Sequence, residues 1–175
     1  GGWRYERYDT ILMIDLRYLQ SVLSYNPTTG IFRWLESRGR VSKGMRAGRI
    51  NSTGYIIINI DEKVYRAHHL AFYLSHHRWP ERLDHKNGIK TDNRIKNLRE
   101  ANRTQNAANA KVKKNSLSGI KGVAFAWHAN KWFARITVNR KCRHLGYYSS
   151  KKKAQKAYMK AAKQHFGEFA FHGSR

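Results

Sequence analysis

The stretch LDHKNGIKTDNRIKNLREANRTQN, residues 83–106, brings a carboxylate, an imidazole and several amides close together in the sequence. Two very short apolar pieces lie on either side of a polar loop, and Asn87-Gly88 is a turn-forming pair within it. Thr104 can cap a helix that continues through QNAANAKVKK. We therefore predict a strand, a long loop, a second strand and a helix, in this order.

The net charge of the chain indicates the class of partner. The 175 residues include 35 Lys and Arg against 11 Asp and Glu, a formal net charge of +24. A chain this basic is best explained by a polyanionic partner, and a membrane surface is the weaker alternative. Residues 107–175 hold 16 Lys and Arg and one acid, Glu168, so we expect the C-terminal part to be the more electropositive.

The remaining composition predicts a folded protein without cysteine-based sites. Hydrophobic residues make up 41% of the chain and aromatic residues 13%, which is too much apolar surface for a basic disordered tail. The single cysteine, Cys142, excludes a disulfide framework and a cysteine-built zinc site within one chain. Because no apolar run approaches the roughly 20 residues of a membrane span, we expect a soluble, intracellular protein.

Before the central stretch, apolar spacing predicts a helix within residues 10–23 and short strands within 30–35, 45–50 and 54–60. A hairpin around Asp61-Glu62 completes a small antiparallel sheet. A second helix is predicted over residues 65–76, because its apolar positions share one face: Ala67, Leu70, Ala71 and Leu74.

After the central stretch, residues 115–119 interrupt the periodicity and read as a linker. Three strands rich in β-branched and aromatic residues follow, within residues 120–127, 131–138 and 142–148. A last helix is predicted from Ser150, which can cap its start, to Gly167 at its end. Its apolar stripe should cover the sheet and comprises Ala154, Ala157, Tyr158, Ala161, Ala162 and His165.

Asp84 and His85 are the residue pair in which we expect chemistry. A phosphodiester is cut when a cation stabilises the developing charge and a general base activates water. At a strand end that leads into a loop, both side chains can turn toward one pocket, although an Asp-His pair alone is weak evidence.

The spacing of asparagines around this pair resembles the HNH nucleases of the ββα-metal (His-Me finger) superfamily, over about Arg66 to Lys111. The resemblance is closest to the phage and intron-homing branch, which lacks structural zinc. It implies that His85 is the general base and that Asn97, twelve residues later, orients its ring. It also implies that Asp84 and Asn106 are the metal ligands.

The resemblance further implies a metal-dependent DNA endonuclease that leaves a 5′ phosphate and a 3′ hydroxyl. The cofactor is expected to be Mg²⁺, with Mn²⁺ as a substitute and no structural zinc, since Mg²⁺ prefers oxygen ligands. We expect double-stranded DNA as the partner, no membrane, no small-molecule cofactor, and a monomer or homodimer. A phage-encoded protein in the cytoplasm of a bacterial host is implied. Arg94, Arg99 and Arg103 are candidate phosphate contacts.

Residues 118–170 resemble the Apetala-two-type DNA-binding domain, through GIKGV, KWFARI, HLGYY and AYMKAAKQHFGEFA. That family lays its three-stranded sheet in the major groove. Ala124 and Ala126 stand where plant members use arginines, which favours phosphate contact over base readout. Core packing is the alternative role for Trp132. The residues expected to face DNA are Lys121, Trp132, Arg135, Arg143 and His144.

The predicted fold class is α+β in three parts. Residues 1–65 form an N-terminal helix and antiparallel sheet region, 66–114 the ββα-metal core, and 118–173 a three-stranded antiparallel sheet packed on one helix. The alternatives left open are a non-catalytic DNA-binding regulator, a phage restriction-like HNH nuclease, and a basic RNA-binding or ribosome-associated protein. Nicking and double-strand cleavage are both open.

Overall fold

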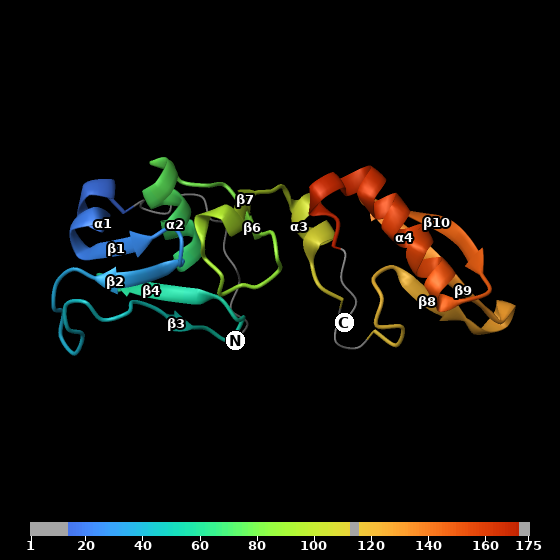
Figure 1. The fold of residues 1–175 in the computed structure, drawn as a ribbon, viewed down its shortest axis with the longest axis horizontal. Helices are drawn as coiled ribbons and strands as arrows, with labels where there is room; N and C mark the ends of the chain where they lie inside the picture. Colours follow the sequence, from blue (N-terminus) through green and yellow to red (C-terminus); the bar gives the residue numbers. More distant parts are fainter. Residues whose placement is uncertain (1–13, 113–115, 172–175) are drawn as a thin grey trace. The chain divides into compact units, whose positions relative to one another are not determined.

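The computed structural model describes residues 14–112 and 116–171, which belong to two compact units. The first unit contains residues 1–81 and 90–98, and the second contains 82–89 and 99–175. Helices and small antiparallel sheets alternate along the chain, which confirms the predicted α+β class (Figure 1). The central stretch contributes to both units: residues 83–89 and 99–106 belong to the second, and residues 90–98 belong to the first.

The first unit begins with helix α1 (Leu16–Val22), whose N-terminus is capped by Asp15. The backbone continues directly into strand β1 (Leu23–Asn26), which pairs with β2 (Ile31–Trp34) in an antiparallel hairpin. The sequence predicted a helix within residues 10–23. The start of the predicted helix lies outside the described residues. Strand β1 was not predicted, because it forms by pairing with β2, and the local sequence pattern does not contain that pairing.

A three-stranded antiparallel sheet follows, in the order β3 (Arg49–Ile50), β4 (Ile56–Ile60) and β5 (Lys63–Arg66). The turn between β4 and β5 has Asp61 at φ 47° and Glu62 at φ 63°. Two consecutive left-handed residues match the twist of a two-residue hairpin. The predicted hairpin at Asp61-Glu62 is therefore confirmed.

Helix α2 (Ala67–His76) supplies the hydrophobic core of the first unit. Ala67, Leu70 and Ala71 are fully buried on the face that the spacing predicted. The helix stops at His77, which adopts the left-handed conformation that ends many helices. Several of the most deeply buried side chains of α1 and of both sheets pack in the same core, among them Leu19, Leu23, Phe32, Ile58 and Ile60.

The second unit opens with the short strand β6 (Leu83–His85), which pairs with β7 (Leu98–Glu100). Between them lies a single 3₁₀ turn, η1 (Ile95–Asn97), and α3 (Arg103–Asn109) follows. The predicted order of strand, loop, strand and helix is confirmed. Thr104 is not the cap: Asn102 accepts from the Gln105 backbone at 2.9 Å, and the Gln105 side chain accepts from the Asn102 backbone at 2.8 Å. This reciprocal pair satisfies two N–H groups, whereas a Thr104 cap would start the helix later.

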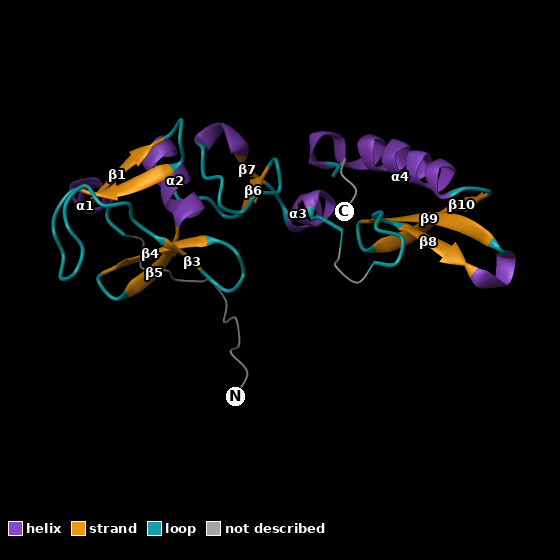
Figure 2. Cartoon of the chain, turned by 60° about the horizontal axis from the view of Figure 1, so that its bottom comes forward, coloured by secondary structure: helices purple, strands orange, loops and turns teal. Residues whose placement is uncertain are grey.

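The C-terminal sheet has the order β10 (Lys141–Tyr148), β9 (Lys131–Val138), β8 (Val123–Ala126), and all its strands are antiparallel. A 3₁₀ turn, η2 (Trp127–Ala129), joins β8 to β9, and η3 (Gly167–Phe169) follows α4 (Lys151–Phe166). In both views α4 lies along one face of this sheet (Figure 2). Ser150 caps α4 as predicted.

The core of this sheet and helix is small and tightly packed. Ala154, Tyr158, Ala161 and Ala162 of α4 are buried against Val123, Ala134 and Ile136, as the stripe predicted, whereas His165 is exposed. Gly122, at φ +68°, lets the Tyr158 ring approach the backbone: a Cβ at that position would lie 2.3 Å from the ring and 2.4 Å from the Arg135 carbonyl oxygen. Burial raises the pKa of Tyr158 to about 12.

Across the part of the chain that the structure describes, none of the helices has both the length and the apolar composition to cross a bilayer.

Candidate functional site

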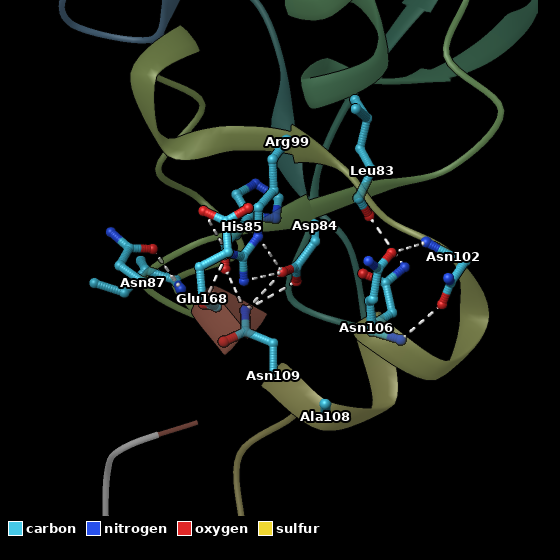
Figure 3. A network of polar contacts seen from close by, with 12 residues as sticks. Leu83, Asp84, His85, Asn87, Arg99, Asn102, Asn106, Ala108, Asn109 and Glu168 are labelled. Atoms are coloured by element: carbon cyan, nitrogen blue, oxygen red, sulfur yellow. Dashed lines mark hydrogen bonds and ion pairs between the residues drawn. The ribbon is translucent and has the colours of Figure 1, made fainter. Parts of the chain in front are cut away.

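The chemistry-bearing residues of the second unit come from three short elements. β6 supplies Asp84 and His85, β7 supplies Arg99, and α3 supplies Asn106 and Asn109. The Arg99 and Asn109 side chains converge on Asp84 (Figure 3). The ββα arrangement therefore places a carboxylate at the end of one strand beneath amides from the following helix.

The Asp84 carboxylate is nearly enclosed and accepts hydrogen bonds from two side chains. Arg99 donates from Nε at 3.0 Å and from Nη2 at 2.9 Å, both to Oδ2. Asn109 Nδ2 lies 3.0 Å from Oδ1 and 2.9 Å from Oδ2. The Asp84 side chain is 12% exposed and that of Arg99 is 9% exposed, so these charge-assisted bonds are poorly screened by solvent.

Asn109 holds both members of the Asp-His pair. Besides meeting the Asp84 carboxylate, its Nδ2 donates to the His85 carbonyl oxygen at 2.7 Å. Asn109 is not among the site residues predicted from the sequence. The signal was present, because Asn106 and Asn109 are three residues apart and so share a face of the helix.

Arg99 also connects Asp84 to the end of the chain's last helical segment. Its Nη1 donates to the Glu168 carbonyl oxygen at 2.9 Å, and its guanidinium lies 3.8 Å from the centroid of the Phe169 ring. With these bonds, Arg99 is committed inside the second unit. Its predicted phosphate contact stays a prediction and would require it to exchange some of these partners.

Asn106, the predicted metal ligand on α3, has an oxygen that hydrogen bonding leaves unused. Its Nδ2 donates to the Leu83 carbonyl oxygen at 3.4 Å, while its buried Oδ1 has no hydrogen-bond donor among the described residues. A buried carbonyl oxygen without a partner is costly. A cation bound there would provide one, and the pairing of an amide oxygen with a carboxylate suits the oxygen preference of Mg²⁺.

A carboxylate-rich or cysteine-histidine metal cage is not part of this site. Over residues 14–112 and 116–171, no three His, Cys, Asp or Glu side chains gather where they could hold an ion together. The roles of Asp84 and Asn106 as metal ligands stay predictions.

The two predicted catalytic residues, His85 and Asn97, are both buried, at 5% and 6% exposure. His85 ends β6, and its carbonyl oxygen also accepts from the Gly88 backbone at 2.8 Å. Asn97 ends η1 in the first unit, where its Nδ2 donates to the Asp92 carbonyl oxygen at 2.8 Å. The orienting role of Asn97 stays a prediction.

Lys121, predicted to face DNA, closes the C-terminal end of α3 instead of extending into solvent. Its Nζ lies 2.7, 2.7 and 2.8 Å from the carbonyl oxygens of Ala107, Ala108 and Ala110. These carbonyls belong to the group that a helix leaves without internal partners. Burial lowers the pKa of Lys121 to about 8. Lys121 thus fixes the end of the helix that carries Asn106 and Asn109.

The other predicted DNA contacts fall into two groups. Arg94, in the first unit, is paired with Asp92 through bonds of 2.7 and 2.5 Å. Trp132 packs partly buried against the core beneath α4, with Lys151 Nζ 5.7 Å from its ring centroid. The exposed members are Arg103, Arg135, Arg143 and His144.

Comparison with known proteins adds one finding. A family model described as HNH endonuclease matches residues 65–108, which span α2, β6, β7 and all of α3 except Asn109. No curated protein and no solved structure matches the chain. The match supports a nuclease activity, for which DNA is the implied substrate and a divalent metal the usual requirement.

Proposed function

We propose that this protein is a Mg²⁺-dependent DNA endonuclease of the HNH homing type, which hydrolyses phosphodiester bonds in duplex DNA and leaves 5′-phosphate and 3′-hydroxyl ends. One observation carries the proposal. Asp84 and His85 lie within the segment that matches the HNH endonuclease model, and the Asn109 amide of α3 contacts both the Asp84 carboxylate and the His85 carbonyl oxygen.

In the proposed reaction, the His85 imidazole takes a proton from the attacking water, and Asn97 orients the ring. Asp84 and Asn106 hold Mg²⁺, with Mn²⁺ as a substitute. When bound, the cation supplies positive charge that stabilises the phosphate and the departing 3′ oxygen.

The contacts of Asp84 are compatible with this role. Arg99 bonds Oδ2 of Asp84, so among the described residues Oδ1 accepts from Asn109 alone and keeps a lone pair for a further partner. Asn109 holds the carboxylate and the His85 carbonyl at once, which limits the movement of the pair before substrate arrives. A site held in position in this way needs little rearrangement during the reaction.

DNA binding is assigned to the basic surface of the second unit. Residues 101–167 contain no Asp or Glu, so the exposed cations among them have no acidic neighbour along the chain. Arg103 lies at the start of α3, while Arg135 and Arg143 lie on the C-terminal sheet. Such a surface positions a duplex through its phosphates.

The direct test is cleavage of supercoiled plasmid in Mg²⁺ or Mn²⁺, with EDTA and His85→Ala as negative controls. His165→Ala, which removes an exposed histidine of α4, is the matched control and should cleave like the unmodified protein. Nicked or linear DNA is expected only with metal and an intact His85. Supercoiled DNA that persists in every lane would rule out the proposed activity.

A further inference from the structure

The C-terminal sheet has one face that α4 does not cover, and aromatic rings gather on it. Ala134 and Ile136 of β9 are buried toward α4, so Phe133 and Arg135 point to the opposite face. Tyr147 is the register partner of Phe133, and His144 that of Arg135, so both join this face. We call Phe133, His144, Tyr147 and the adjacent His128 the aromatic face.

The rings of the aromatic face form one contiguous group. The Phe133 and His144 rings are nearly parallel, with centroids 5.9 Å apart and planes 18° apart. The Tyr147 centroid lies 4.8 Å from that of His144 and 6.3 Å from that of Phe133. His128 meets Tyr147 edge-on at 6.3 Å. Tyr147 is 48% exposed and contacts the His144 ring, so its exposed surface belongs to a contiguous group of rings.

The charge around these rings identifies the kind of partner. Lys131, Phe133 and Arg135 are every second residue of β9, so their side chains lie on the same face of the sheet. The Arg135 guanidinium carbon is 5.9 Å from the Phe133 ring centroid. Because residues 101–167 carry no carboxylate, a neutral apolar partner would leave these cations without counterions. Flat rings set among cations suit a polyanion that also presents flat apolar surfaces.

We propose that the aromatic face binds unpaired nucleotides, with bases stacked on Tyr147 and His144 and with phosphates on Lys131 and Arg135. In a duplex the flat faces of the bases are covered by their neighbours, so only unpaired bases can use ring stacking. This site goes beyond the proposed cleavage of duplex DNA, because it would hold a displaced or locally opened strand.

The test measures binding without cleavage, in EDTA, so that its outcome is independent of the nuclease proposal. Three labelled probes of equal length are used: a 12-mer of dT, an abasic 12-mer with the same phosphates but no bases, and a 12-base-pair duplex. The unmodified protein should bind the dT probe several-fold more tightly than the abasic one. Tyr147→Ala should weaken dT binding by about 5-fold to about 100-fold, as expected for loss of one stacking ring.

Two variants locate the effect. Tyr147→Phe keeps the ring and should bind the dT probe within about twofold of the unmodified protein, a margin well below the loss of one stacking ring. Trp127→Ala removes a ring that is 83% exposed but contacts Phe125 instead of the aromatic face, and it should also leave dT binding unchanged.

Three outcomes would overturn the proposal. The first is equal affinity of the unmodified protein for the dT and abasic probes, which would mean that phosphate contacts alone account for the binding. The second is an equal loss on all three probes in Tyr147→Ala, and the third is a loss in Trp127→Ala as large as that in Tyr147→Ala. A melting temperature of Tyr147→Ala within a few degrees of the parent excludes unfolding as the cause.

Discussion

Replacing Arg99 with Met should destabilise the second unit by about 3–5 kcal/mol, the usual cost of breaking a buried ion pair. Arg99 donates twice to Asp84, at 3.0 and 2.9 Å, and both side chains are about nine-tenths buried. The substitution keeps an unbranched apolar side chain over Phe169. It leaves the Asp84 charge with Asn109 as its remaining side-chain donor, and one neutral amide compensates poorly for a lost guanidinium.

The double variant Asp84→Leu with Arg99→Met should be more stable than Arg99→Met alone, because it removes both charges instead of leaving one. This outcome separates the cost of an unpaired charge from the cost of lost packing. The difference between the double variant and the sum of the two single variants is the coupling energy, which we expect to be at least about 1 kcal/mol for residues in direct contact.

The assay is urea unfolding followed by circular dichroism and by tryptophan fluorescence, since Trp127 and Trp132 lie in the second unit. Arg103→Met is the matched control: it removes an exposed arginine a few residues away and should change the unfolding free energy by no more than about 0.5 kcal/mol. If Arg99→Met costs no more than Arg103→Met, or if the effects of the Asp84 and Arg99 substitutions are simply additive, the ion pair does not stabilise the second unit.

Three further predictions concern the same unit. Gly122→Ala should lower the unfolding free energy by more than about 2 kcal/mol in a urea titration, because its Cβ would overlap the Tyr158 ring and the Arg135 carbonyl at a positive φ. Gly167→Ala, which has open space around it, should lower it by about 1 kcal/mol. The Lys121 pKa of about 8 lies below the ordinary lysine value of about 10.4, so between these pH values the unfolded chain binds more protons and the unfolding free energy should rise with pH. Lys121→Met should lack this rise, and parallel pH profiles of the two proteins would contradict the burial of the ammonium. Finally, Mg²⁺ should raise the melting temperature of the parent protein but not that of Asp84→Asn. Asn106→Ala should need at least about tenfold more Mg²⁺ for the same rise. If both variants respond to Mg²⁺ as the parent does, these residues do not belong to the metal site.

Local patterns predicted most of the secondary structure because they report directly on periodicity and on chain turns. The hairpin at Asp61-Glu62, the buried face of α2 and the start of α4 at Ser150 all follow from residues adjacent in sequence. The α3 cap was predicted at the wrong residue, because Thr104 and Asn102 are both capable caps. The distinguishing signal was present in the sequence, because Gln105 follows Asn102 at the three-residue spacing of a capping box.

The candidate site was predictable as a set of residues but not as a set of contacts. Asp84, His85 and Asn106 stand out by their spacing, whereas the roles of Arg99 and Asn109 depend on which side chains meet across β6, β7 and α3. The contacts of Lys121 were not predictable either, because Lys121 is separated from the end of α3 by a linker whose sequence has no periodic pattern.

By itself, the sequence determined the α+β class, the need for a polyanionic partner and the position of a nuclease-like motif, because composition, charge and spacing are properties of the chain. Only the tertiary structure decided how these residues are used. It paired Asp84 with Arg99 and Asn109, left the Asn106 oxygen without a donor among the residues that the structure describes, and gathered Phe133, His144 and Tyr147 on one open face. The physical reason is that burial and hydrogen bonding depend on neighbours in space, which come from elements far apart in the chain.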